Sequence, residues 1–140
     1  MVGILVVSHG RLAEALISAA QSLVGSFQKV RGVSIWPRDR EKEICERIQK
    51  AIVEVNEGEG VVILTDVLGG TPTNLSLPFL ENEQVEVVTG VNLPMLLTLW
   101  SYRRERSIRE MGRLVKKSGR RSIMSAKRVL PLKERTNTKS

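Results

Sequence analysis

The hydrophobic pattern begins with an apolar run at the N-terminus, MVGILVV, which stops at the polar residues Ser8 and His9. A short β-branched run of this kind is typical of a strand buried on both faces, as in a parallel sheet covered by helices. Apolar residues then recur at helical spacing over residues 12–23, and this pattern closes near Gly25. We therefore expect a central strand, a turn containing His9 and an amphipathic helix.

The alternation of strand and helix patterns continues along the chain. Further strands are predicted at residues 30–36, 60–64 and 84–89, and further helices from Asp39 as N-cap to residue 55, over about 73–80, and from about 93 to 117. Strands that alternate with helices form right-handed βαβ units. The predicted fold class is thus α/β, an open, mainly parallel, doubly wound sheet of four strands with flanking helices. Residues 120–132 can hold a fifth, short strand.

The length and the cysteine content indicate one domain in a reducing compartment. At 140 residues the chain can bury a core without disulfides, and its single cysteine, Cys45, has no internal partner. We place the domain at residues 1–132 and a polar, disordered tail at 133–140. No apolar run is long enough to span a bilayer and no secretion signal is found, so we expect a cytoplasmic protein with at most peripheral membrane association.

The net charge of +7 is unevenly distributed, with a balance of −4 over residues 1–100 and +11 over residues 101–140. Residues 1–100 contain 8 basic and 12 acidic side chains, whereas residues 101–140 contain 14 basic and 3 acidic ones. This asymmetry is compatible with a solvated end or with docking to an acidic surface of a protein partner. Nucleic acid is not an expected partner, because the basic part has few aromatic residues and no recognised reading motif.

Two strand ends carry the candidate chemistry. His9, the only histidine, ends the first strand, and Asp66 follows the third strand, so both reach the same sheet edge if these strands are neighbours. A carboxylate beside one ring nitrogen fixes the imidazole tautomer and leaves the other nitrogen as acceptor, nucleophile or metal ligand. Gly69, Gly70 and Thr71 add close backbone and a hydroxyl, which suit an oxyanion or a phosphoryl group.

Several other kinds of site fit these residues less well. One histidine, one distant cysteine and one loop aspartate do not form a zinc set, and we predict no metal and no cofactor. Ser8 precedes His9, but no nucleophile elbow surrounds it, and no Walker A motif is present. His9 can also be a plain loop residue, Asp66 a helix cap and GGTP a turn.

Three motifs together resemble one protein family. VVSHG at 6–10, TDVLGGTPTN at 65–74 and TGVNLPML at 89–96 resemble, in order and spacing, the mannose-type enzyme IIA domain of the bacterial phosphoenolpyruvate-dependent sugar phosphotransferase system. The resemblance implies that His9 accepts a phosphoryl group from phospho-HPr on Nε2 and passes it to a IIB component for sugar uptake.

The resemblance also assigns the neighbouring residues and the assembly. It implies that Asp66 holds Nδ1 of His9, and that Gly10, Gly69, Gly70 and Thr71 surround the phosphoryl group. It further implies a homodimer in which residues 120–129 form an antiparallel strand in the partner's sheet. An alternative is a regulatory module that signals through His9 phosphorylation without sugar transport. The phosphoryl-carrier subunit of dihydroxyacetone kinase fits the GGTPTN and GVNLPML stretches less well.

Overall fold

The first strand is the centre of the molecule because its apolar run is buried on both faces. The computed structural model describes residues 1–67 and 70–129, and in it β1 (Gly3–His9) lies between β2 (Val30–Ile35) and β3 (Val61–Thr65). The edge strand β4 (Val85–Thr89) completes the sheet in the order β2-β1-β3-β4, with every pair parallel. The predicted four-stranded parallel sheet is confirmed.

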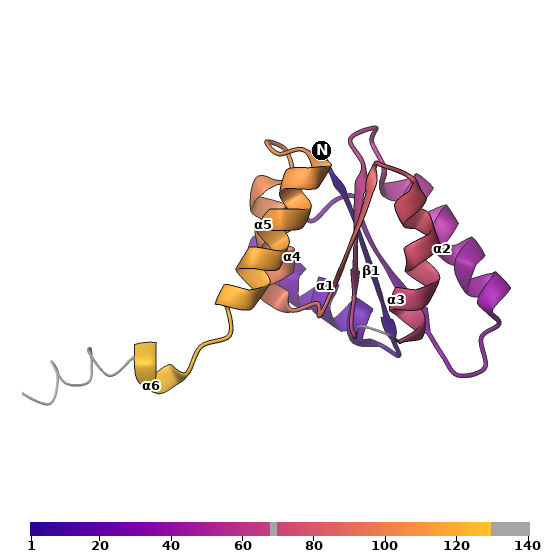
Figure 1. Ribbon diagram of the computed structural model, residues 1–140. Helices are drawn as coiled ribbons and strands as arrows, with labels where there is room; N and C mark the ends of the chain where they lie inside the picture. The colour runs from indigo at the N-terminus through magenta and orange to yellow at the C-terminus, as the bar shows by residue number, and fades with distance from the viewer. Residues whose placement is uncertain (68–69, 130–140) are drawn as a thin grey trace, which may run out of the picture.

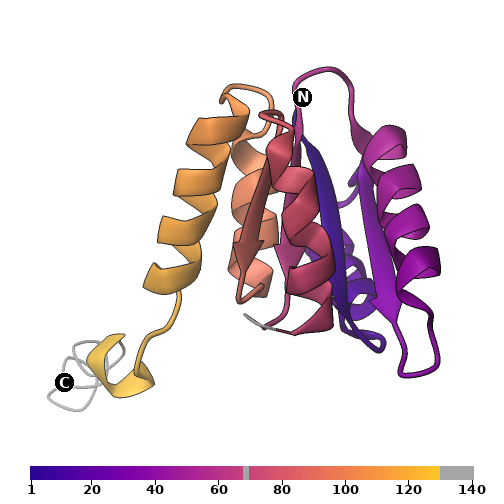
Figure 2. The ribbon, with the colours of Figure 1, turned by 45° about the vertical axis from the view of Figure 1, so that its right-hand side comes forward.

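Two layers of helices cover the sheet (Figure 1). One face packs against α1 (Leu12–Val24), α4 (Leu93–Tyr102) and α5 (Ile108–Arg121), and the other packs against α2 (Glu41–Val55), α3 (Thr71–Ser76) and the 3-10 helix η1 (Leu77–Glu81). Side chains of β1 alternate between the two layers, as strand geometry requires: Ile4 and Val6 join one core, Leu5 and Val7 the other. All four are fully buried. The turned view shows the α5 layer beside β4 (Figure 2).

Two helix predictions were wrong in detail. The helix expected to run without a break to residue 117 is divided, because α4 ends at Tyr102 and α5 begins after Ser107. The N-cap position of the second helix is occupied by Arg40, whose side chain makes no capping hydrogen bond, and not by Asp39. The Asp39 carboxylate instead accepts hydrogen bonds from the Trp36 N–H at 2.9 Å and from the Arg47 guanidinium at 2.8 Å.

The C-terminal region does not form the predicted fifth strand in this chain. Arg120 and Arg121 end α5, and Ala126–Val129 form the short helix α6. Residues 130–132 of that predicted strand, and the predicted tail 133–140, lie outside the described residues. An antiparallel strand exchanged with a partner would need a second chain, so the exchange stays a prediction. In the described part of the chain, no helix is both long and apolar enough to cross a membrane.

Candidate functional site

The topology brings His9 and Asp66 to the same edge of the sheet. β1 and β3 are neighbours in parallel register, with Val7 opposite Thr65, so the next residues of both strands emerge side by side. This confirms the predicted neighbourhood of the two loops. The carboxyl ends of parallel strands are where ligands of such folds gather.

Three hydrogen bonds fix the Asp66 carboxylate against His9. Its Oδ2 lies 2.8 Å from Nδ1 of the His9 ring and accepts the His9 backbone N–H at 2.9 Å, while Oδ1 accepts the Val67 N–H at 2.9 Å. The side chain of Asp66 is 11% exposed and that of His9 is 53% exposed. An ionised carboxylate only accepts, so in the neutral form of the His9 ring Nδ1 carries the proton and Nε2 has the lone pair.

The same contacts keep Asp66 ionised. Partial burial raises the pKa of Asp66, but the hydrogen bonds from the His9 N–H, the His9 ring and the Val67 N–H outweigh burial. The net effect lowers the pKa of Asp66 below its ordinary value of 3.8. The site therefore holds a fixed negative charge behind the imidazole near neutral pH.

Ser8 does not accompany His9 into the site. Adjacent residues of a strand point to opposite faces, and the Ser8 side chain is fully buried. Its Oγ accepts the Ala13 N–H at 2.8 Å, which satisfies one of the unpaired donors at the start of α1. The arrangement gives Ser8 a capping role and does not support a serine nucleophile.

The glycines and Thr71 of the predicted site differ in what they offer. A Cβ on Gly70 would lie 3.1 Å from Cε1 of His9, so the backbone of Gly70 lies directly against the ring. Thr71 begins α3 and lines, with His9, a cavity of about 550 Å³. Gly10 has a φ of +56°, which favours glycine, but its N–H donates to the Ile35 carbonyl at 3.0 Å. Gly69 lies outside the described residues.

A threonine cluster that the sequence analysis did not single out supports the loop after β3. Thr73 Oγ1 donates to the Val67 carbonyl at 2.6 Å and lies 2.6 Å from Thr65 Oγ1. Thr89 Oγ1, at the end of β4, lies 3.5 Å from Thr73 Oγ1. The sequence did contain a signal for this cluster, because threonines occur at two strand ends and in the first turn of a helix.

Trp36 is a second residue that the sequence analysis missed. It follows β2, lines the same cavity as His9, and is 46% exposed. Its position was signalled by the end of a predicted strand at the same edge as His9. A large exposed aromatic ring of this kind suits contact with a protein partner.

The geometry suits a nucleophilic imidazole. One ring nitrogen is held by a carboxylate, and the ring stays half-exposed above a cavity. Within residues 1–67 and 70–129, no three histidine, cysteine or acidic side chains lie together as a metal site would require.

Comparisons with known sequences place the chain in one protein family. A family model described as the PTS system fructose IIA component matches residues 3–116. The mannose-specific EIIAB component of Escherichia coli (strain K12) is 30% identical over 128 residues, which are 90% of this chain and 40% of that protein. The fructose-specific EIIA component of Bacillus subtilis (strain 168) is 26% identical over 112 residues, which are 79% of this chain and 77% of that protein. The chain thus spans less than half the length of the EIIAB relative.

Solved structures give the same picture. The PTS IIA protein associated with the fucose utilization operon from Streptococcus pneumoniae matches with a TM-score of 0.79 and 31% identity, over 91% of this chain and 95% of that chain. The phosphotransferase system component EIIA from Streptococcus agalactiae matches with a TM-score of 0.81 and 24% identity, over 89% and 97% of the two chains. The second likeness concerns the fold alone.

Proposed function

Since the chain belongs to the family of PTS system fructose IIA components, we propose that it carries a phosphoryl group on His9 between two protein partners. It accepts the group from phospho-HPr and passes it to a IIB component that serves sugar uptake. One observation carries this proposal: Nδ1 of His9 is held 2.8 Å from Asp66, while the ring remains half-exposed. A carrier residue needs this combination of fixed orientation and access.

In the proposed transfer, Nε2 is the nucleophile. Its lone pair forms a bond to phosphorus while the bond between phosphorus and the donor's histidine nitrogen breaks, and the donor keeps that electron pair. The proton on Nδ1 stays in the hydrogen bond to Asp66, so no proton has to leave the imidazole. The positive charge that develops on the ring is stabilised by the Asp66 carboxylate, whose pKa is lowered by its three hydrogen bonds despite the opposing effect of burial.

Backbone and hydroxyl groups are the proposed partners of the phosphoryl oxygens. Gly70 lies against the His9 ring and Thr71 shares the cavity, so both suit a group carried on Nε2. Gly10 contributes by having no side chain, because its N–H is already bonded to Ile35. We retain Gly69 as a proposed contact from the resemblance. Neutral donors stabilise phosphoryl oxygens without a lysine.

The test is phosphorylation of the purified chain with enzyme I, HPr and radiolabelled phosphoenolpyruvate. We expect one acid-labile, base-stable phosphate per chain, and none in the His9→Ala and His9→Gln variants. Circular dichroism of both variants separates loss of the acceptor from loss of the fold. Label that persists in folded His9→Ala protein would reject the proposal.

A second step tests the acceptor. Addition of a purified mannose-type IIB protein should remove the label from the chain and transfer it to the IIB protein. If the chain becomes labelled but no IIB protein accepts the group, sugar transport is rejected and the regulatory alternative is favoured.

A further inference from the structure

The turn that carries Asp66 is bound to helix α3 through one buried hydroxyl. Thr73, in the first turn of α3, is 2% exposed, and its Oγ1 lies 2.6 Å from the Val67 carbonyl oxygen and 2.6 Å from Thr65 Oγ1. Thr65 and Val67 are the two neighbours of Asp66 in the chain. Thr73 therefore contacts the residues immediately before and immediately after the one that holds the His9 ring.

The direction of these hydrogen bonds follows from the number of hydroxyl protons. A carbonyl can only accept, so the single hydroxyl proton of Thr73 points to Val67. Thr65 must then donate its own proton to Thr73 Oγ1. The result is a short relay of hydrogen bonds from Thr65 to Thr73 to the Val67 carbonyl. Both bonds of this relay require the hydroxyl of Thr73.

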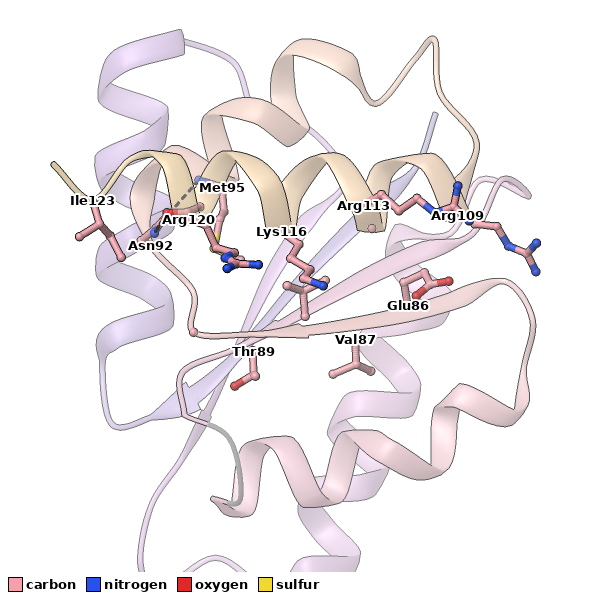
Figure 3. A pocket seen from close by; sticks show the side chains of 14 residues that line it. Glu86, Val87, Thr89, Asn92, Met95, Arg109, Arg113, Lys116, Arg120 and Ile123 are labelled. Atoms are coloured by element: carbon pink, nitrogen blue, oxygen red, sulfur yellow. Dashed lines mark hydrogen bonds between the residues drawn. The ribbon is translucent and has the colours of Figure 1, made fainter.

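The sheet fixes the start of the relay. Thr65 is fully buried at the end of β3, where it is paired with Val7 on one side and with Thr89 on the other. Its backbone carbonyl accepts the Val91 N–H at 2.9 Å. Figure 3 shows the side chain of Thr89 directed away from α5, toward the opposite layer, and its Oγ1 lies 3.5 Å from Thr73 Oγ1. Thr73 thus joins the loop after β3 to the ends of two strands.

The other end of the relay reaches two sides of the His9 ring. The Val67 N–H donates to Asp66 Oδ1 at 2.9 Å, and Asp66 Oδ2 lies 2.8 Å from Nδ1 of His9. The Val67 carbonyl also accepts the Gly70 N–H at 3.4 Å, and a Cβ on Gly70 would lie 3.1 Å from Cε1 of His9. A shift of Val67 would therefore move the carboxylate and the glycine backbone that contact the ring.

We propose that Thr73 is a positioning residue for the phosphoryl transfer, a role that rests on the proposed function of His9. Its hydroxyl acts through Val67 to set the place of Asp66, and Asp66 in turn orients the ring. The hydroxyl bonds to Thr65 and Val67, so its effect on the reaction is indirect. Misplacement of a reacting group by about 1 Å can slow a reaction about 100-fold, so loss of this support should be measurable.

The first test is the rate of labelling by phospho-HPr, measured by rapid quench and expressed per folded molecule. Thr73→Val keeps the shape of the side chain but removes the hydroxyl, and we expect labelling at least about tenfold slower. Thr73→Ser keeps the hydroxyl and should be labelled within about threefold of the wild-type rate. Wild-type labelling of Thr73→Val, or equal slowing of Thr73→Ser, would overturn the proposal.

Ser76→Ala is the matched control on the same helix. Ser76 is fully buried, and its Oγ also donates to a backbone carbonyl at 2.6 Å, that of Pro72 within α3. Its removal should weaken α3 but leave labelling per folded molecule within about twofold of wild type. Equal slowing of Ser76→Ala and Thr73→Val would mean that any weakening of α3 disturbs the site, and would overturn the specific role of Thr73.

A double variant tests the relay without leaving a buried hydroxyl unpaired. In Thr73→Val the Thr65 hydroxyl loses this acceptor, which is destabilising in a buried position. Thr65→Val with Thr73→Val replaces both partners by groups of the same shape, so the test stays open if the single variant does not fold. Both hydroxyls belong to one relay, so the double variant should be slowed about as much as Thr73→Val alone. A folded double variant with the wild-type rate would overturn the proposal.

Nitrogen-15 NMR of the His9 ring separates the role of Thr73 from the proposed function, because it needs no phosphoryl donor. At a pH where the ring is neutral, the wild-type chain and Ser76→Ala should carry the proton on Nδ1, whereas Thr73→Val should show a mixture of the two tautomers. One tautomer in all three proteins would overturn the proposed role, even if Thr73→Val were labelled slowly. A wild-type chain that is not labelled, together with the tautomer change in Thr73→Val, would reject the proposed function alone and support the action of Thr73 on the ring.

Discussion

The Asp66 carboxylate shows how one side chain can orient another. It contacts both the ring and the backbone N–H of His9, so the imidazole is held at two points by a single group. The third contact, from the Val67 N–H, fixes the carboxylate itself. A ring held in this way presents Nε2 in one tautomer, which makes Asp66 a positioning residue in the proposed transfer.

Replacing Asp66 with asparagine should slow phosphorylation without unfolding the protein. An amide can present its N–H to Nδ1, which favours the wrong tautomer and removes the charge that stabilises the developing imidazolium. We expect the rate from phospho-HPr to fall roughly tenfold or more, measured by rapid-quench labelling. An unchanged rate would show that Asp66 has no part in orienting the ring. Asp39→Asn is the matched control, because Asp39 lines the same cavity but bonds to Trp36 and Arg47.

The pH dependence of stability provides a second readout of the same variant. Burial opposes ionisation of Asp66, but its hydrogen bonds prevail and lower its folded pKa below the ordinary 3.8. Its contribution to stability is therefore present above pH 3.8 and is lost as the pH falls through the lowered folded pKa. Urea titrations should show a larger stability difference between the wild-type chain and Asp66→Asn at pH 7 than below pH 3.

Among single residues, the sequence predicted the side chains whose positions follow from strand order, and it missed those whose positions depend on packing. His9 and Asp66 follow buried apolar runs, so their shared edge could be expected from the alternation of strands and helices. Thr73 is positioned by its hydrogen bond to the Val67 carbonyl, and Trp36 by its place after β2 beside the cavity of His9. Both positions depend on how side chains pack in the folded chain, and the local pattern contains no measure of that packing.

Among the elements, the division between α4 and α5 is the clearest departure from the pattern. Apolar residues continue at helical spacing past residue 100, which predicted one long helix. The chain leaves the helix at Arg103, and α5 begins with a capping box at Ser107. The sequence Ser107, Ile108, Arg109, Glu110 has the S-x-x-E form of this motif, so a local signal for the new helix was present.

The capping box predicts the effect of Ser107→Ala. Ser107 Oγ accepts the Glu110 N–H at 3.2 Å, and Glu110 Oε1 accepts the Ser107 N–H at 3.4 Å. Removal of the hydroxyl should lower the free energy of unfolding by about 1 kcal/mol, measured by urea titration. Ser101→Ala is the control, since Ser101 Oγ bonds only within α4 to the Leu97 carbonyl and is exposed. Equal losses in the two variants would contradict a special role for the cap.

In the molecule as a whole, the candidate site and a buried contact that stabilises the fold lie at opposite edges of the sheet. The site lies at the carboxyl edge of the sheet, whereas the amino edge is held by a buried arginine at the end of α4. The pattern predicted the α/β class and the strand number. It did not predict that Arg103 is buried, because an arginine in a basic run is typical of a solvated surface.

Arg103 joins three segments at the amino edge. Its guanidinium donates to the carbonyls of Val2 at 2.9 Å, Gln28 at 2.6 Å and Lys29 at 3.0 Å, and it lies 5.6 Å from the centre of the Phe27 ring. The residue is 2% exposed. Burial lowers the pKa of Arg103 to about 10, so the side chain remains charged at neutral pH.

The variant Arg103→Leu separates the two edges. Three carbonyls lose the guanidinium as a donor, although the Lys29 carbonyl keeps the Ile4 N–H, and we expect the free energy of unfolding to fall by about 3 kcal/mol or more. Arg104→Leu, at an exposed neighbouring position, should change it by no more than about 0.5 kcal/mol. His9 ends β1 about 20 Å from the start of that strand, where Arg103 binds the Val2 carbonyl. Phosphorylation per folded molecule should therefore stay unchanged in Arg103→Leu. An Arg103→Leu protein that stays fully folded but is labelled slowly would show that Arg103 also positions the site, because the two edges of the sheet would then be coupled through β1.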